Sequence, residues 1–210
     1  MFFCFVVGKE VFVSCTEIYA FDIKGNAYLF GTVSNSWRGA MAIWRYLEEK
    51  YLPPYIPNYM RSLGVTTAEE CKRQMNFVPT RCSACQIRDM QEIWDLCDSP
   101  KLSEAERICL YTTFDRYLIK KEDIPRVVKA FKEFEGDTSL KAQAEILEKA
   151  YKDDNCMAIG WNQTSVCADN WGTYGGYDQE LDKVIPYNCL NDDNHDWIFE
   201  EMEACNEELS

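Results

Sequence analysis

The residues of this chain that are best suited to surface chemistry are the carboxylates near its C-terminus. Between Tyr151 and Ser210, 14 Asp and Glu residues stand against two lysines, which gives this segment a net charge of −12. The whole chain of 210 residues carries −13, so residues 1–150 are close to neutral. Charge segregated in this way indicates a basic partner, because opposite electrostatic fields steer two surfaces together.

A C-terminal helix would present these carboxylates. The pattern of residues 194–209 places Ile198, Met202, Cys205 and Leu209 on one helical face, and carboxylates at steps of four, three and four residues on another. The residues that we expect to bind a partner are Asp192, Asp193, Asp196, Glu200, Glu203 and Glu207. Like charges at this spacing oppose a helix, so helix stability does not explain the stripe. It is either a solvated face or a docking surface.

An aromatic and glycine-rich stretch is the second candidate site. Its aromatic members are Trp161, Trp171, Tyr174, Tyr177 and Tyr187. Aromatic rings stack on bases and sugars, so a neutral nucleoside- or sugar-like molecule would fit this loop. Residues 156–210 hold one lysine and no arginine, which argues against phosphate-bearing ligands and direct nucleic-acid binding. Ordinary aromatic packing or a protein interface is the simpler explanation.

The cysteines offer a weaker case for a metal site. Cys82 and Cys85 have the two-residue gap that lets two thiolates share a tetrahedral ion, and Cys71 and Cys97 flank them. Because no second close pair exists, we predict reduced thiols, no bound metal and no cofactor. His195 is the only histidine and stands among carboxylates that favour a helix start, so we assign no catalytic residue. Enzymatic activity stays open, and a binding role is favoured.

Composition predicts a folded α+β protein. With 47% hydrophobic and 14% aromatic residues, the chain can bury a substantial core. Its first residues lack the basic region and cleavage site of a signal peptide and are too few for a membrane span. Eleven cysteines, an odd number, fit free thiols in a reducing compartment. We therefore expect a cytoplasmic protein without membrane contact.

The pattern divides the chain into three segments that we expect to form one compact unit. In residues 1–62, β-branched and aromatic runs at 10–15, 18–23 and 27–33 predict an antiparallel β-meander. A packed helix follows, and its apolar stripe consists of Trp37, Met41, Trp44, Leu47 and Tyr51.

The other two segments carry the helices and the acidic end. Residues 63–153 predict a block of short amphipathic helices, two of them opened by capping boxes at Thr66–Glu69 and Ser103–Glu106. Residues 154–210 predict a strand, the aromatic loop and the acidic helix.

Two stretches carry a resemblance to other proteins. Residues 34–44 read SNSWRGAMAIW and residues 160–166 read GWNQTSV. They are similar to uncharacterised accessory proteins in phage genomes, and this resemblance implies inhibition of a host factor, such as a nuclease or another defence enzyme. Together with the acidic tail, it leads us to expect a stoichiometric inhibitor that occupies a basic surface of a host nucleic-acid-binding protein. The alternative is an enzyme or sequestering module for a nucleoside- or sugar-like molecule held by the aromatic loop.

Overall fold

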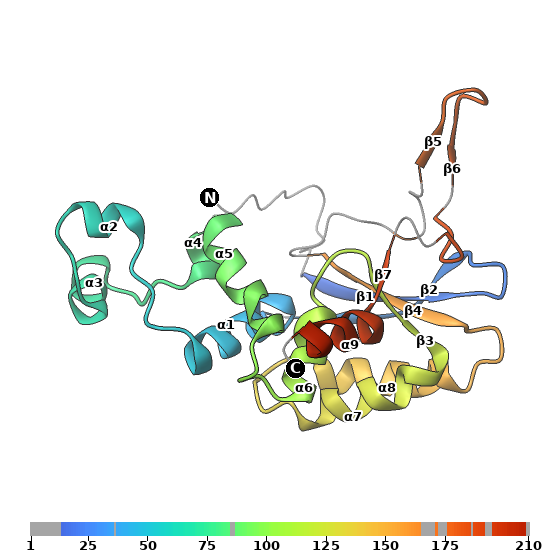
Figure 1. Ribbon diagram of the computed structural model, residues 1–210, viewed down its shortest axis with the longest axis horizontal. Helices are drawn as coiled ribbons and strands as arrows, with labels where there is room; N and C mark the ends of the chain where they lie inside the picture. The colour runs from blue at the N-terminus through green and yellow to red at the C-terminus, as the bar shows by residue number, and fades with distance from the viewer. Residues whose placement is uncertain are drawn as a thin grey trace, which may run out of the picture.

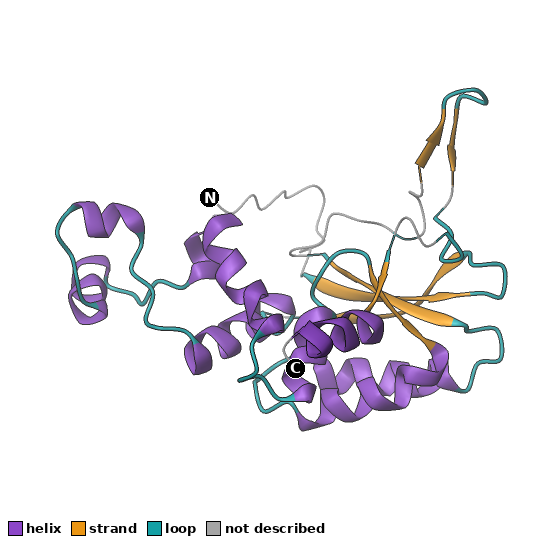
Figure 2. Cartoon of the chain, in the orientation of Figure 1, coloured by secondary structure: helices purple, strands orange, loops and turns teal. Residues whose placement is uncertain are grey.

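The computed structural model describes residues 14–35, 37–84, 87–164, 171, 176–185, 187–191 and 195–208. These residues form an α+β fold, as predicted, in which helices pack against a mixed sheet (Figures 1 and 2). The strands of the main sheet, in spatial order, are β2 (Ala27–Ser34), β1 (Cys15–Phe21), β4 (Ala158–Gln163), β3 (Tyr117–Lys120) and β7 (Asp196–Trp197). A separate hairpin consists of β5 (Gly176–Asp178) and β6 (Lys183–Ile185).

The helices fall between and after these strands. In chain order they are α1 (Ala40–Tyr51), α2 (Asn58–Ser62), α3 (Ala68–Met75), α4 (Arg81–Ala84), α5 (Ile87–Trp94), α6 (Glu104–Tyr111), α7 (Ile124–Glu133), α8 (Leu140–Tyr151) and α9 (Ile198–Glu208). Two short 3-10 helices, η1 (Asp95–Asp98) and η2 (Lys121–Asp123), follow α5 and β3. Over the described residues, no helix is long and apolar enough to cross a lipid bilayer.

The predicted hairpin at the N-terminal end is confirmed. β1 and β2 are antiparallel, and their turn is closed by the Asp22 carboxylate, which accepts hydrogen bonds from the backbone N–H groups of Lys24 and Asn26. Gly25 adopts a φ of +80° there, a value that glycine reaches without steric strain. The second neighbour of β1 is β4, whereas a simple meander would place the 10–15 strand beside it. That predicted strand lies almost wholly outside the described residues.

The central block is not entirely helical, which corrects the prediction. β3 pairs antiparallel with β4 and parallel with β7, so the three predicted segments all supply strands to one sheet. The four residues of β3 show no alternation of apolar and polar side chains, because Leu118 and Ile119 are buried on opposite faces of the sheet. Because β3 lies between β4 and β7, it brings the C-terminal residues next to the chain that enters α7.

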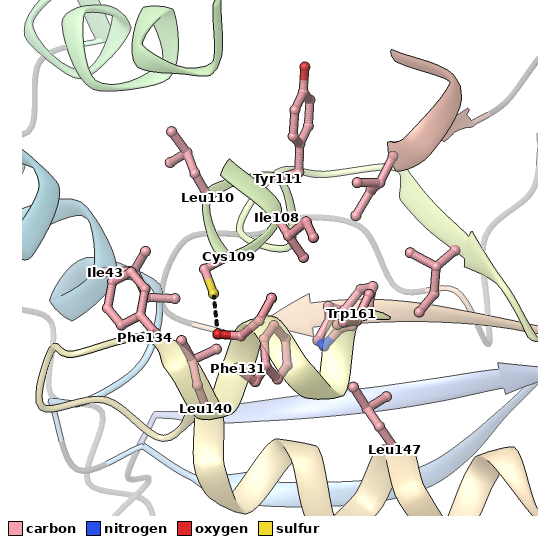
Figure 3. Packing of buried hydrophobic residues seen from close by; sticks show 14 of the residues in the cluster. Ile43, Ile108, Cys109, Leu110, Tyr111, Phe131, Phe134, Leu140, Leu147 and Trp161 are labelled. Atoms are coloured by element: carbon pink, nitrogen blue, oxygen red, sulfur yellow. Dashed lines mark hydrogen bonds between the residues drawn. The ribbon is translucent and has the colours of Figure 1, made fainter. Parts of the chain in front are cut away.

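One face of the sheet is covered by α6, α7 and α8 (Figure 1). The larger core lies on this side of the sheet, and α1 and α9 also contribute side chains to it. Figure 3 shows this packing, with Trp161 of β4 lying among side chains from the helices. The ring of Phe131 lies 6.2 Å from that of Trp161, and the Cys109 thiol donates to the carbonyl of Ala130. The sulfur therefore behaves as a small buried side chain of the core.

The prediction for Trp37 is wrong. The sequence pattern places it at the start of the apolar stripe of a helix, but α1 begins at Ala40 and Trp37 is 78% exposed with a φ of +72°. The backbone N–H of Arg38 donates to the carbonyl of Asn35, and this turn interrupts the helical pattern. The prediction that this helix packs through its apolar stripe is confirmed for Trp44 and Leu47, which are buried.

A small helical lobe stands at the far end of the molecule from the sheet (Figure 1). α2 and α3 enclose a core of their own, made by Met60, Val65 and Cys71. The helix cap differs by one residue from the prediction, since Thr67 rather than Thr66 accepts the hydrogen bond at the start of α3. The second predicted cap, Ser103–Glu106 at the start of α6, is confirmed with both of its hydrogen bonds.

Candidate functional site

The C-terminal helix presents two contrasting faces, as its sequence predicts. Ile198 and Met202 are buried against the core, while Glu200 and Glu203 are exposed. The helix starts four residues later than expected, because Asp196 and Trp197 form β7 and pair with β3. Asp196 is exposed at the sheet edge, so it is not part of a continuous helical stripe.

A groove of about 270 Å³ runs between α9 and the connection from β3 to α7. Its walls combine carboxylates, aromatic rings and one cation. The lining residues are Leu118, Ile119, Lys120, Glu122, Asp123, Trp197, Phe199, Glu200 and Glu203. We call Glu122, Asp123, Glu200 and Glu203 the groove carboxylates. β3 supplies one wall and α9 the other, so the β3–β7 pairing is what creates the groove.

The structure joins two predicted partner-binding residues with two that the sequence analysis missed. Glu200 and Glu203 were expected, whereas Glu122 and Asp123 stand about eighty residues earlier and come from η2. Their sequence signal is weak, because acidic residues before a helix that starts near a proline are typical of any helix start. Asp192 and Asp193 lie outside the described residues. Glu207 lies in α9, but its side chain is also outside the description.

One internal cation sits in the groove. The Lys120 Nζ lies 2.7 Å from the Glu200 Oε1 and 5.3 Å from the centre of the Trp197 ring. The hydrogen bond to Glu200 raises the pKa of Lys120, so the ammonium form is favoured. Lys120 thus contacts both kinds of group that line the groove.

The charge of the groove remains predominantly negative. Partial burial raises the pKa of Asp123, and the neighbouring charge of Glu122 raises it further. Arg126 and Lys120 act in the opposite direction without reversing the shift. A carboxyl with a raised pKa is one whose ionised form lacks sufficient positive charge or solvent around it. An added cation would therefore be favoured beside Asp123.

The aromatic residues proposed as a ligand loop are placed very differently. Trp161 is buried in the core on the helix side of the sheet, whereas Trp171 and Tyr187 pack with Phe21 on the opposite side. The Trp171 and Tyr187 rings meet edge to face at 4.6 Å, and the Trp171 Nε1 donates to the Trp161 carbonyl. These three side chains are buried on two faces and do not line one open pocket. Tyr174 lies outside the described residues, and so does the side chain of Tyr177.

The cysteines proposed as weak metal candidates are also separated. Cys71 is in the core of the α2–α3 lobe, where its thiol lies 3.5 Å from the Met75 sulfur. Cys82 and Cys97 belong to the larger core, and Cys85 lies outside the described residues. Within the part of the chain that the structure describes, no three Cys, His, Asp or Glu side chains are arranged to share a metal ion.

Comparisons of this chain with family models, with curated proteins and with solved structures find no match. Its function must therefore be inferred from the geometry and charge of the groove. Carboxylates around aromatic rings bind cations, because each carboxylate attracts the charge and each ring face attracts it through its quadrupole. The lining residues include no histidine, cysteine, serine or threonine that could act as a nucleophile or as a neutral base.

Proposed function

We propose that this protein acts by binding, and that it docks through its acidic groove on a basic surface of a partner protein. The observation that carries the proposal is the meeting of the four groove carboxylates around Trp197 and Phe199. Two of these carboxylates come from η2 and two from α9, so the fold itself concentrates the charge. The protein would act in the cytoplasm and in stoichiometric amounts.

A nucleic-acid-binding protein is the partner class that this surface fits best. Proteins of that class carry clusters of Lys and Arg that neutralise backbone phosphates. Glu200 and Glu203 lie about one turn apart on α9, so their charges repeat over a few ångströms, the same scale on which phosphates repeat along a strand. The protein would then act as an inhibitor by occupying the cations that otherwise contact nucleic acid, in agreement with the role that the phage resemblance implies.

The aromatic residues would supply the apolar part of the contact. Phe199 is largely buried, and Trp197 is half-buried; both line the groove. Exposed ion pairs contribute little to affinity alone, and interfaces gain most from aromatic and arginine residues in desolvated positions. A basic side chain that enters the groove would gain both contributions.

The test is capture of a partner from the native host by the tagged protein, with matched charge variants. The groove variant is Glu122→Lys with Glu203→Lys. The control is Glu69→Lys with Glu145→Lys, which changes the same charge at exposed positions of α3 and α8. We expect the control to retain the partner and the groove variant to lose it.

The captured complex then needs quantitative measurement. Affinity should fall steeply between about 50 and 200 mM salt, in proportion to the number of ion contacts. Added protein should release nucleic acid from the partner with an endpoint of one to one. Equal affinity of the groove and control variants, with an unchanged salt slope, would reduce the acidic face to a solvated surface.

A further inference from the structure

Lys120 shows directly how the groove holds a basic side chain. Its ammonium group lies against the Glu200 carboxylate at 2.7 Å and over the Trp197 ring at 5.3 Å. The position lies within the groove, since all three residues line it. Contact with a carboxylate and a ring face together is the geometry that proteins use to recognise lysine and arginine.

A second internal cation uses the other aromatic residue of the groove in the same way. The Arg126 guanidinium carbon lies 4.2 Å from the centre of the Phe199 ring, and the Arg126 Nε donates to Glu104. Arg126 approaches Phe199 from outside the groove, because it is not among the lining residues. A lysine and an arginine on this part of the molecule thus each contact one aromatic ring and one carboxylate.

We infer that the groove receives one basic side chain of the partner at the position that the Lys120 ammonium occupies, and that Lys120 is an internal competitor for this position. The inference rests on the proposed function and specifies its contact. The incoming lysine or arginine would place its charge beside Glu200 and its aliphatic stem along Trp197.

Displacement of Lys120 requires little energy. Its side chain is 42% exposed and that of Glu200 is 60% exposed, so water can solvate both when they separate. Ion pairs of this kind contribute weakly to stability and are screened by salt. Glu122 and Asp123 lie at the same groove and raise its negative charge beyond what Lys120 neutralises. A released Lys120 can therefore move to a neighbouring carboxylate while the partner occupies the ring.

The experiment is calorimetric titration of the full-length protein with an acetylated, amidated hexalysine peptide. The variants are Lys120→Ala and a matched control, Lys129→Ala. Lys129 lies on α7, pairs with Glu133 and is not among the residues lining the groove, so the control removes the same charge. We expect Lys120→Ala to bind hexalysine about fivefold more tightly than Lys129→Ala at low salt. Addition of Glu200→Gln to both variants should abolish this difference.

A nuclear magnetic resonance measurement locates the binding. The indole N–H signal of Trp197, assigned with Trp197→Phe, should move when hexalysine is added to wild type and should move further with Lys120→Ala. Thermal melts establish that the variants are folded. If Lys120→Ala fails to fold, Lys120→Met keeps the packed stem and permits the same comparison with Lys129→Met.

The outcomes separate this inference from the proposed function. Equal affinities of Lys120→Ala and Lys129→Ala, with binding still weakened by Glu122→Lys and Glu203→Lys, would overturn the competitor role alone. Absence of hexalysine binding by wild type and by Lys120→Ala would overturn both. Tighter binding that is confined to Lys120→Ala and depends on Glu200 supports the inference.

Discussion

The acidic helix and the aromatic stretch of the C-terminal segment are both candidate sites in the sequence, but the fold exposes the first and buries most of the second. The acidic helix α9 keeps Glu200 and Glu203 in solvent and joins them to carboxylates from η2. The aromatic stretch turns inward, where Trp171 and Tyr187 cover the side of the sheet that the helices leave open. Charged residues stay exposed because burial of an unpaired charge is costly, whereas an aromatic ring gains free energy wherever it is buried.

The comparison teaches that a residue type indicates a site only when the fold leaves it accessible. A tryptophan suits a ligand pocket and a core equally well, and the decision depends on what surrounds it. Gly160 of β4 decides it here, because an added Cβ would lie 3.1 Å from Trp171, so the glycine lets the indole approach the sheet. A carboxylate is buried only where it has partners, as Glu106 has in the cap of α6. Glu200 and Glu203 are exposed, which makes the acidic signal more informative here.

The strongest test of the comparison is Trp171→Ala. If Trp171 is a core residue, its loss should reduce the free energy of unfolding by about 3 to 5 kcal/mol, through lost burial and the remaining cavity. Chemical denaturation measures this. A variant that unfolds like wild type but loses affinity for a nucleoside or sugar would instead identify a pocket and revive the alternative function.

A smaller effect is expected from Gly160→Ala. The new Cβ would meet Leu118 at 2.7 Å and Trp171 at 3.1 Å, so both side chains must shift. We expect a loss of about 1 to 2 kcal/mol in the free energy of unfolding, typical of overpacking. A Trp171→Phe background provides the control, because the smaller ring should relieve part of the clash. Equal losses in both backgrounds would contradict the proposed packing.

Local sequence patterns predict the individual helices and strands of this fold, but they do not predict which of these elements pack side by side. The hairpin of β1 and β2, the Ser103–Glu106 cap and the buried face of α9 follow from side-chain periodicity and hydrogen bonding between nearby residues. The insertion of β4 between β1 and β3 depends on contacts between distant residues, and no local pattern encodes them.

The candidate site shows the same limit. Glu200 and Glu203 could be predicted, because they repeat at helical spacing opposite an apolar face. Glu122 and Asp123 could not, since their place in the groove depends on β3 pairing with β7. The predictions for Trp37 and Thr66 are wrong for local reasons. A turn before α1 exposes Trp37. Thr67 with Glu70 offers the same capping pattern as Thr66 with Glu69, one residue later.

The acidic region should respond to mutation in the opposite way from the aromatic region. Glu203→Lys should change the free energy of unfolding by no more than about 0.5 kcal/mol, because the side chain is exposed and leaves no cavity. The same change should weaken hexalysine binding, which calorimetry measures. Glu145→Lys on α8 is the control for charge alone. A large loss of stability in Glu203→Lys would show that this carboxylate holds the fold together.

The smallest expected effect is that of Asp123 on the pH dependence of stability. Its sign shows whether the charge of Asp123 is balanced by the protein or is left for an external cation. Burial and Glu122 raise the pKa of Asp123 in the folded protein. An acid with a higher pKa when folded binds protons more tightly in that state. Stability contributed by its protonated form is therefore lost as pH rises through the folded pKa. Asp123→Asn removes this loss.

The melting temperature of Asp123→Asn relative to wild type should consequently be higher at about pH 6 than at about pH 3. A bound basic ligand should likewise raise the melting temperature of wild type more at about pH 6 than at about pH 3. The reason is that a bound cation lowers the pKa of Asp123 and offsets the repulsion from Glu122. Hexalysine affinity should then fall as pH decreases through the pKa of the free groove. A relative melting temperature that does not vary with pH would mean that Asp123 is balanced by its own surroundings and has no need of an external cation.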